Sequence, residues 1–385
     1  MNRLTTSGAG FELTRHPEDP RDPLRAWDAA DEYLLRRLEG ADEADPVDLS
    51  GAVVVVGDRW GALSTVLAGH RPVQITDSYL AQRATLANLG RNGMDADAVR
   101  LLSARDTPPD RIDVLLVRVP KSLALLEDQL HRLAPAVHPG TVVIGTGMVK
   151  EIHTSTLKLF ERIIGPTRTS LAVKKARLIF CTPGAGTPRT PSPWPYRYDL
   201  PDGLGPVSGR TVTNHAGIFC AERLDIGTRF FLGHLPARSG PDRVVDLGCG
   251  NGVVGLSAAL ANPEATVTFV DESYQAVASA EETFRANTGP DAKAEFVVGD
   301  GLAELPPASV DLVLNNPPFH SHQATTDATA RTMFQGARDA LRPGGELWVV
   351  GNRHLGYHTR LRRIFGNCTT VAGDPKFVVL RAVRR

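Results

Sequence analysis

The sequence predicts an α/β protein made of two tandem, doubly wound domains with mainly parallel sheets. Three observations carry this prediction. The chain has 385 residues, more than one compact core usually contains. Short apolar strands alternate with helical patterns in two stretches, residues 53–180 and 243–383. The order of strands, turns and helices in the first stretch recurs in the second, which indicates an internal duplication.

The second stretch contains the signals of a parallel sheet in order. An apolar strand enters the glycine turn Gly248–Gly252, and a helix follows. A second strand ends at Asp271, and a third leads into the run Asn315–Phe319. A helix, a turn at Pro343-Gly344 and a last apolar strand complete the pattern. We therefore predict one complete copy of the plan in this stretch.

The first stretch repeats the order with different residues at the equivalent positions. Its glycine turn, Gly57–Gly61, contains Arg59 and Trp60, whose side chains would crowd a ligand. Asp77 keeps the place of the acidic residue after the second strand. The third strand leads into Arg118–Lys121, where no asparagine is present. We interpret this copy as degenerate and catalytically inactive.

A segment rich in proline and glycine separates the two copies. Prolines remove backbone donors and stiffen the chain, so residues 182–211 are predicted to be a connector outside either sheet. The predicted domains are therefore residues 1–181, the degenerate copy, and residues 212–385, the intact copy.

Composition excludes several classes of protein. The chain is 42% hydrophobic and 22% charged, which argues against disorder, and no apolar run is long enough to span a membrane. Basic and acidic residues both number 43, so net charge alone predicts no polyanionic partner. The four cysteines show no CxxC spacing and the N-terminus has no signal-peptide pattern. We expect a cytoplasmic protein without membrane attachment, disulfides or metal.

The glycine turn and the acidic residue after it predict a nucleotide-like ligand. Glycines between a strand and a helix allow a tight turn and bring backbone amides close to a ligand. The turn follows Asp246, and Asp271 stands at a strand end, where a carboxylate can accept hydrogen bonds from ribose hydroxyls. This spacing fits either a dinucleotide or S-adenosylmethionine.

The run Asn315–Phe319 favours S-adenosylmethionine. Its two prolines fix the backbone and leave carbonyls free, the Asn316 amide supplies an acceptor oxygen, and Phe319 supplies a flat apolar face. Together these groups can accept both protons of an exocyclic NH2 group and stack on the ring that carries it. A rigid turn with a packing aromatic would be the better interpretation if the motif stood alone.

These motifs resemble those of a known family. The segment Asp246–Gly252, Asp271, residues 298–300 and the NPPF run are similar to motifs I to IV of class I S-adenosylmethionine-dependent methyltransferases, which have a Rossmann-like fold. More narrowly, Leu224–Pro236 and the C-terminal run from Asn352 resemble the RlmG/RsmC family of ribosomal RNA guanine-N2 methyltransferases, which are built from two tandem methyltransferase folds. The C-terminal run is closer to the large-subunit enzyme. The resemblance is strong over residues 212–385 and much weaker before them.

The resemblance implies a set of cofactor-binding residues. Asp246 and the backbone of Gly248 and Gly250 would hold the methionine end of S-adenosylmethionine. Asp271 would accept hydrogen bonds from the ribose hydroxyls, and Asp300 would lie against the adenine.

The resemblance also implies how the reaction is promoted. Asn316 and the Pro317 carbonyl would accept the hydrogens of the target amine, while Phe319 stacks on the flipped base. An amine conjugated into guanine is a poor nucleophile, and accepting its protons aims its lone pair at the methyl group. Because the amine proton becomes acidic after transfer, no strong general base is needed.

The implied reaction is methyl transfer from S-adenosylmethionine to N2 of a guanine in 23S ribosomal RNA, carried out by a monomer on naked or partly assembled RNA. Four alternatives stay open: a 16S RNA target, adenine-N6 methylation, glutamine-N5 methylation of a protein, and a non-catalytic RNA-binding assembly factor. In the first copy, Arg118, Lys121 and the basic stretch from Lys158 to Arg177 suggest RNA recognition through phosphates. A purely structural scaffold is the alternative for that half.

Overall fold

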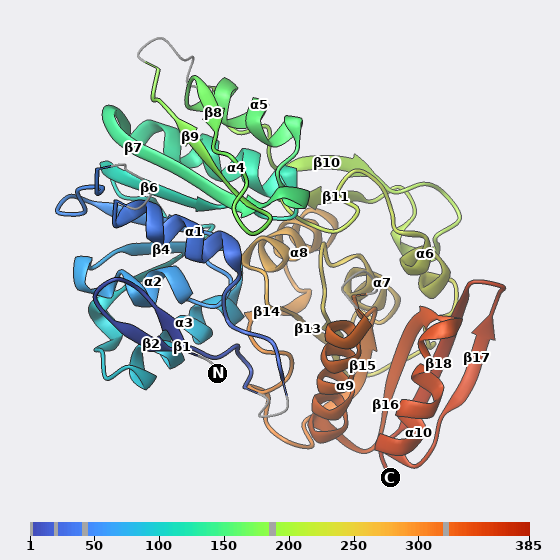
Figure 1. The fold of residues 1–385 in the computed structure, drawn as a ribbon. Helices are drawn as coiled ribbons and strands as arrows, with labels where there is room; N and C mark the ends of the chain where they lie inside the picture. Colours follow the sequence, from blue (N-terminus) through green and yellow to red (C-terminus); the bar gives the residue numbers. More distant parts are fainter. Residues whose placement is uncertain (1–2, 19–21, 41–44, 185–189, 319–322) are drawn as a thin grey trace. The chain divides into compact units, whose positions relative to one another are not determined.

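Two seven-stranded sheets, one in each of two units, form the core of the protein (Figure 1). The computed structural model describes all residues except 1–2, 19–21, 41–44, 185–189 and 319–322. The units are Met1–Pro193 and Trp194–Arg385.

The second unit contains the sheet with strand order β14-β13-β12-β15-β16-β18-β17. Its strands are β12 (Arg243–Leu247), β13 (Thr266–Asp271), β14 (Lys293–Val298), β15 (Val310–Asn315), β16 (Leu341–Asn352), β17 (Thr369–Gly373) and β18 (Phe377–Val383). The first five are parallel to their neighbours, and only the pairings that involve β18 are antiparallel. The strand order reverses beside β12, and folds of this kind bind ligands outside the carboxyl ends of the strands at such a reversal.

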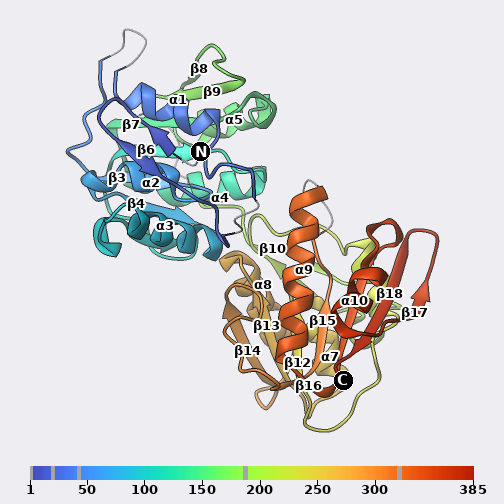
Figure 2. The same cartoon turned by 60° about the horizontal axis from the view of Figure 1, so that its bottom comes forward.

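Helices cover both faces of this sheet (Figure 2). They are α6 (Ile226–Leu232), α7 (Val253–Ala261), α8 (Tyr274–Asn287), α9 (Gln323–Ala340) and α10 (Tyr357–Phe365). Alternate residues of β12 point to opposite sides, so Val244 packs with α6, α7 and α8 whereas Val245 packs with α9 and α10. Burial on both faces explains the uninterrupted apolar runs Val244–Val245 in β12 and Leu312–Leu314 in β15.

The first unit repeats the same strand order, β5-β4-β3-β6-β7-β9-β8. Its strands are β3 (Val53–Val56), β4 (Val73–Thr76), β5 (Arg100–Ser103), β6 (Ile112–Arg118), β7 (Val137–Met148), β8 (Thr167–Thr169) and β9 (Ala176–Cys181). Its helices are α1 (Ala29–Leu38), α2 (Ala62–Val66), α3 (Tyr79–Arg91), α4 (Leu123–Leu133) and α5 (Thr154–Ile163). The predicted α/β fold with two doubly wound sheets is therefore confirmed, and the duplication is visible in the topology.

Short elements connect these parts. An N-terminal hairpin pairs β1 (Arg3–Thr5) with β2 (Gly10–Glu12). Single 3-10 turns are formed by η1 (Ala68–His70), η2 (Ala96–Ala98), η3 (Ala134–Ala136), η4 (Val149–Glu151), η5 (Gly205–Val207) and η6 (Arg353–Leu355).

The proline-rich segment differs from its expected form. We expected residues 182–211 to lie outside any sheet, but β10 (Tyr196–Asp199) pairs antiparallel with β11 (Thr211–Asn214). Leu200 and Leu204, which follow β10, are buried in the core of the second unit. The division between the units falls at Pro193–Trp194, so the second half of the segment belongs to the second unit. The segment contains apolar side chains as well as prolines. Burying Leu200 and Leu204 in the core of the second unit removes them from water and holds this part of the segment against that unit.

Candidate active site

The carboxyl ends of β12, β13 and β15 bring the predicted cofactor and catalytic segments together. Leu247, the last residue of β12, is paired with Val270 on one side and Asn315 on the other. The glycine turn follows Leu247, Asp271 follows Val270, and Asn316 follows Asn315. Segments that are up to about 70 residues apart in sequence therefore meet at one edge of the sheet.

The glycine turn forms a cradle with one open side. The Gly248 amide donates to Val270 O at 2.8 Å, which ties the turn to β13. Gly252 has φ +77°, and a Cβ there would lie 2.8 Å from the Cα of Ala280 in α8, so the turn packs too closely against that helix for a side chain. Gly250 has φ +53°, but no atom lies within 4 Å of its Cβ position. Its absent side chain leaves open space at the start of α7, where a ligand can approach the backbone.

Asp271 lies directly beside this cradle. Its Oδ2 accepts from the Gly250 amide at 3.0 Å and its Oδ1 from the Ser273 amide at 3.1 Å. Burial raises the pKa of Asp271, although these backbone hydrogen bonds oppose the rise. The Gly299 amide donates to Asp271 O at 3.0 Å, which brings the partly exposed Asp300 to the next strand end.

Asp246 and Cys249 are buried under the same turn. The Asp246 side chain is 3% exposed, and its Oδ2 accepts from the Gly255 amide in the first turn of α7 at 2.7 Å. Burial raises the pKa of Asp246 to about 8. Burial also raises the pKa of the Cys249 thiol well above its ordinary value, with Asp271 and Asp246 adding to the shift. Cys249 is therefore a packing residue in this turn and is unsuited to act as a nucleophile.

Asn316 presents a buried acceptor that has no partner. Its Nδ2 donates to Thr228 Oγ1 at 2.9 Å, whereas its Oδ1 has no hydrogen-bond partner among the described residues. Asn315, in contrast, is fully buried and its Nδ2 donates to Leu247 O at 2.7 Å. Pro317 is buried beside Asn316, and Phe319 lies outside the described residues. An unpartnered buried oxygen at this edge of the sheet is suited to accept a hydrogen from a bound substrate.

The equivalent position in the first unit is filled by a buried ion cluster. The pairings of β6 with β3 place Arg118 where Asn316 stands in the second unit. The Arg118 side chain is 1% exposed, with Asp28 at 2.6 Å, Glu151 at 3.0 Å and Asp31 at 3.2 Å. The expectation that Arg118 contacts RNA phosphates is therefore wrong, because its charge is enclosed by carboxylates. Lys121, three residues further on, is exposed.

The cofactor cradle of the first unit is also closed. Arg59 stands at the position of Gly250, and its guanidinium pairs with Glu151 at 2.9 Å and Asp28 at 3.6 Å. The side chain that replaces the central glycine thus joins the same ion cluster. This geometry agrees with the interpretation of the first copy as inactive.

Asp77 does not occupy the position of Asp271, as the sequence suggested, and the strand register shows the difference. Ser78 and Ser273 each cap the helix that follows, accepting from the amides of Ala81 and Ala276. Asp271 stands two residues before its capping serine, so its equivalent in the first unit is Thr76 and not Asp77. Thr76 Oγ1 accepts from the Ser78 amide at 3.2 Å, as Asp271 does from Ser273. The first unit therefore lacks the carboxylate as well as the asparagine.

Thr228 and Asp225 are site residues that sequence reasoning did not single out. Thr228 lies in the first turn of α6, and Asp225 is the N-cap residue just before that helix. The sequence signal for them is Asp225 itself, because aspartate is among the preferred residues at helix N-caps. The link from Thr228 to Asn316 spans 88 residues and appears only in three dimensions.

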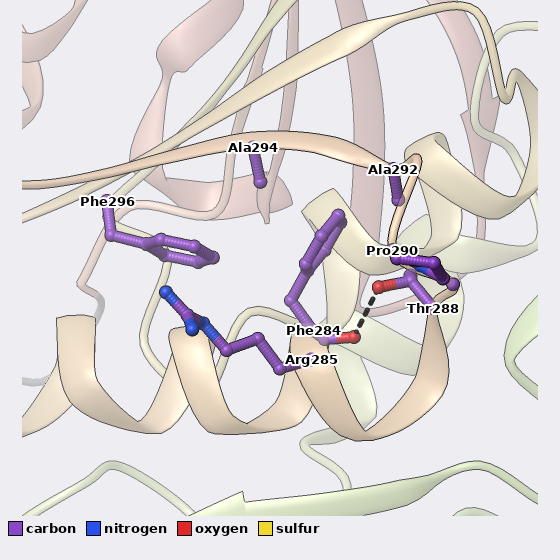
Figure 3. Close-up of a pocket in the computed structure, with 8 residues that line it drawn as sticks. Phe284, Arg285, Thr288, Pro290, Ala292, Ala294 and Phe296 are labelled. Carbon is purple, nitrogen blue, oxygen red and sulfur yellow. Dashed lines mark hydrogen bonds between the residues drawn. The ribbon is translucent and has the colours of Figure 1, made fainter.

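A separate cavity lies at the other end of α8 (Figure 3). Its volume is about 410 Å³, and it is lined by Phe284, Arg285, Thr288, Gly289, Pro290, Ala292, Ala294 and Phe296. Because α8 starts just after Asp271, its C-terminal end is remote from the glycine turn, and none of the predicted site residues lines this cavity.

Two features are absent from the described residues. They contain no group of three or more His, Cys, Asp or Glu side chains arranged to hold a metal ion. No helix within them is both long enough and apolar enough to cross a membrane.

Comparison with known proteins places the chain in a family. The family model described as RLMG N-terminal domain matches residues 1–185, and the one described as Methyltransferase small domain matches residues 209–381. A solved structure titled as a T. thermophilus 16S rRNA N2 methyltransferase (RsmC) in complex with AdoMet and guanosine shares the fold, with a TM-score of 0.75 at 22% identity. The match covers 100% of this chain and 97% of the chain in that structure.

Three curated relatives cover nearly the whole chain, and each is named "Ribosomal RNA large subunit methyltransferase G". The relative from Streptomyces griseus is 80% identical over 100% of both chains. The relative from Stutzerimonas stutzeri is 49% identical over 100% of both, and that from Pseudomonas aeruginosa is 50% identical over 99% of this chain and 100% of its own. The chain therefore belongs to the ribosomal RNA large subunit methyltransferase G family.

Proposed function

We propose that the second unit transfers a methyl group from S-adenosylmethionine to the exocyclic N2 of a guanine in 23S ribosomal RNA. The observation that carries this proposal is the Oδ1 of Asn316, a buried acceptor with no partner among the described residues, at the strand edge beside the glycine turn. The large-subunit RNA target is supported by the names of relatives up to 80% identical to this chain.

The residues around the cradle fit S-adenosylmethionine. The open space at Gly250 admits a ligand against the backbone of Gly248 and Gly250, and Asp246 places a carboxyl group beneath the turn for the methionine end. Asp271 can accept hydrogen bonds from ribose hydroxyls, and Asp300 lies at the adjoining strand end for the adenine. The bound cofactor would supply an electrophilic methyl group.

The catalytic residues act mainly by positioning. Asn316 Oδ1 and the Pro317 carbonyl accept the two amine hydrogens and aim the nitrogen lone pair at the methyl group. Phe319, whose structure is not described, is proposed to stack on the base after it is flipped out of the RNA. The proton that leaves after transfer passes to solvent, so none of these groups has to act as a strong base.

The first unit is proposed to bind RNA and to take no part in the chemistry. Its cradle is closed by Arg59 and Arg118, so phosphate contacts would come from exposed cations such as Lys121 and Lys175. Lys174 is also exposed and pairs with Glu32 at 3.2 Å. We propose that the chain acts as a monomer in the cytoplasm, where ribosomal RNA is made.

Mass spectrometry of ribosomal RNA from a deletion strain tests the proposal. We expect the loss of one N2-methylguanosine from 23S RNA and its return when the wild-type chain is supplied. Loss from 16S RNA instead would move the target to the small subunit, and loss of N6-methyladenosine would change the target atom. An unchanged set of modified nucleosides in both RNAs would contradict RNA methylation altogether.

A further inference from the structure

We propose that Thr228, held by Asp225, is a positioning residue that fixes which end of the Asn316 amide faces the substrate. This inference rests on the proposed function, since it concerns how the acceptor oxygen of the same site is oriented. Thr228 would not contact the reacting atoms. It would act only through Asn316.

Two hydrogen bonds join Asp225 and Thr228 at the start of α6. Asp225 caps the helix, and its Oδ2 accepts from the Thr228 amide at 2.8 Å and from Thr228 Oγ1 at 3.3 Å. The Thr228 hydroxyl then receives Asn316 Nδ2 at 2.9 Å. A chain of hydrogen bonds therefore runs from the Asp225 carboxylate through Thr228 to Asn316.

The direction of this chain follows from the number of protons available. An ionised carboxylate can only accept, so the single hydroxyl proton of Thr228 is directed to Asp225. The hydroxyl oxygen is left as an acceptor, and only the NH2 end of the Asn316 amide can satisfy it. Reversing the amide would place two oxygens against each other without a proton between them. The network thus directs Oδ1 of Asn316 away from Thr228, where it has no partner among the described residues.

This orientation matters for the reaction. A target amine presents hydrogens and needs an acceptor, whereas a reversed amide would present its own NH2 group to the substrate. The two donors would repel each other and turn the nitrogen lone pair away from the methyl group. Correct orientation of Asn316 is therefore a condition for transfer.

The first unit supplies an internal comparison. Asp28 caps α1 as Asp225 caps α6, and Asp31 occupies the third position of its helix, as Thr228 does. Asp31 faces Arg118, the residue at the position of Asn316, with 3.2 Å between Arg118 Nε and Asp31 Oδ1. Both copies thus keep a contact between these two positions. Only the second combines a neutral hydroxyl with an amide, the pair that leaves an acceptor free.

Two substitutions of Thr228 separate orientation from packing. Thr228→Val keeps the shape but removes the hydroxyl, so we expect kcat to fall at least about tenfold. The affinity for S-adenosylmethionine, measured by calorimetry, should stay within about twofold of wild type. Thr228→Ser restores the hydroxyl and should recover most of the wild-type kcat. Thr288→Val, a matched change at the far end of α8, should leave both quantities unchanged, since its hydroxyl donates to Phe284 O and lies away from the Asn316 site.

A second measurement does not depend on activity. In the ¹⁵N-labelled protein without ligands, the side-chain amide of Asn316 can be identified by its loss in Asn316→Ala. Its protons should exchange with solvent more rapidly in Thr228→Val than in wild type or Thr228→Ser, because the hydrogen bond that holds Nδ2 is absent.

Each outcome has a distinct meaning. Unchanged exchange and unchanged kcat in Thr228→Val would overturn the positioning role. A loss of S-adenosylmethionine affinity as large as the loss of kcat would also overturn it, because Thr228 would then contact the cofactor directly. If the wild-type chain transfers no methyl group to RNA, the proposed function fails, and the exchange measurement still decides whether Thr228 holds the amide.

Discussion

Replacing Arg118 by methionine should destabilise the first unit strongly. The Arg118 side chain is 1% exposed and lies against Asp28, Asp31 and Glu151. Arg118→Met preserves most of the side-chain volume but removes the charge that these carboxylates share. Although burial opposes the effect, Arg118 and Arg59 lower the pKa of Glu151 to about 2, so Glu151 is ionised at neutral pH.

The size of the effect can be worked out from this enclosure. Removing one partner of a buried ion pair costs about 3–5 kcal/mol, because the remaining charge stays buried without compensation. For a unit of this size, 1 kcal/mol corresponds to a shift of about 2–4 °C in melting temperature. Calorimetric unfolding of the full chain at pH 7 should therefore show one transition lowered by about 6–20 °C. The unfolding transition of the second unit can be recognised because S-adenosylmethionine should raise its melting temperature. That transition should be unaffected by Arg118→Met.

Two comparisons sharpen this test. Arg59→Met removes a side chain that is 27% exposed, and a smaller shift is expected because solvent can screen the remaining carboxylates. Glu151 has a folded pKa below its unfolded value, so its contribution is present above about pH 4.5 and is lost as pH falls towards 2. A shift below about 2 °C for Arg118→Met at pH 7 would refute the view that this cluster is a structural replacement for the lost active site.

Further predictions concern the cofactor site. Asp271→Ala should weaken S-adenosylmethionine binding by about 10–100-fold in calorimetry, since charge-assisted hydrogen bonds to the ribose are worth about 1.5–3 kcal/mol; unchanged affinity would remove Asp271 from the site. The same titration of the wild-type chain should reach one cofactor per chain, and a value of two would contradict a closed first unit. Burial raises the pKa of Asp246 to about 8, so its contribution to stability without ligand is lost as pH rises from about 4 to 8. Affinity for the cationic cofactor should rise over the upper part of this range, and the rise should be absent in Asp246→Asn.

The fold and most of the site could be predicted because the relevant signals are local. An apolar strand followed by closely spaced glycines indicates a strand-turn-helix unit. The structure shows why glycine is needed, because Gly248 and Gly252 both have positive φ. Because residues 53–180 repeat the order of elements found in residues 243–383, a second sheet of the same kind could be predicted for them. Asp271 and Asn316 could be selected because they directly follow predicted strands, and parallel strands end at one edge of a sheet.

What sequence reasoning missed depends on burial and register. An arginine next to a former site suggests a phosphate contact, and only the structure shows that Arg118 is enclosed by residues 28, 31 and 151. Asp77 is one residue away from the position of the acidic residue, and side chains one residue apart point in different directions along a strand. Thr228 resembles any threonine near a helix start until its contact with Asn316 is seen.

The most direct test of the central claim is methylation of purified 23S RNA by the purified chain. With labelled S-adenosylmethionine, digestion of the product should yield N2-methylguanosine as the labelled nucleoside. Asn316→Ala should bind the cofactor with nearly wild-type affinity but retain no more than a few per cent of wild-type turnover, about a 2 kcal/mol effect or more. Substantial turnover by Asn316→Ala, or label in a different nucleoside, would contradict the assignment of Asn316 as the acceptor for a guanine amine.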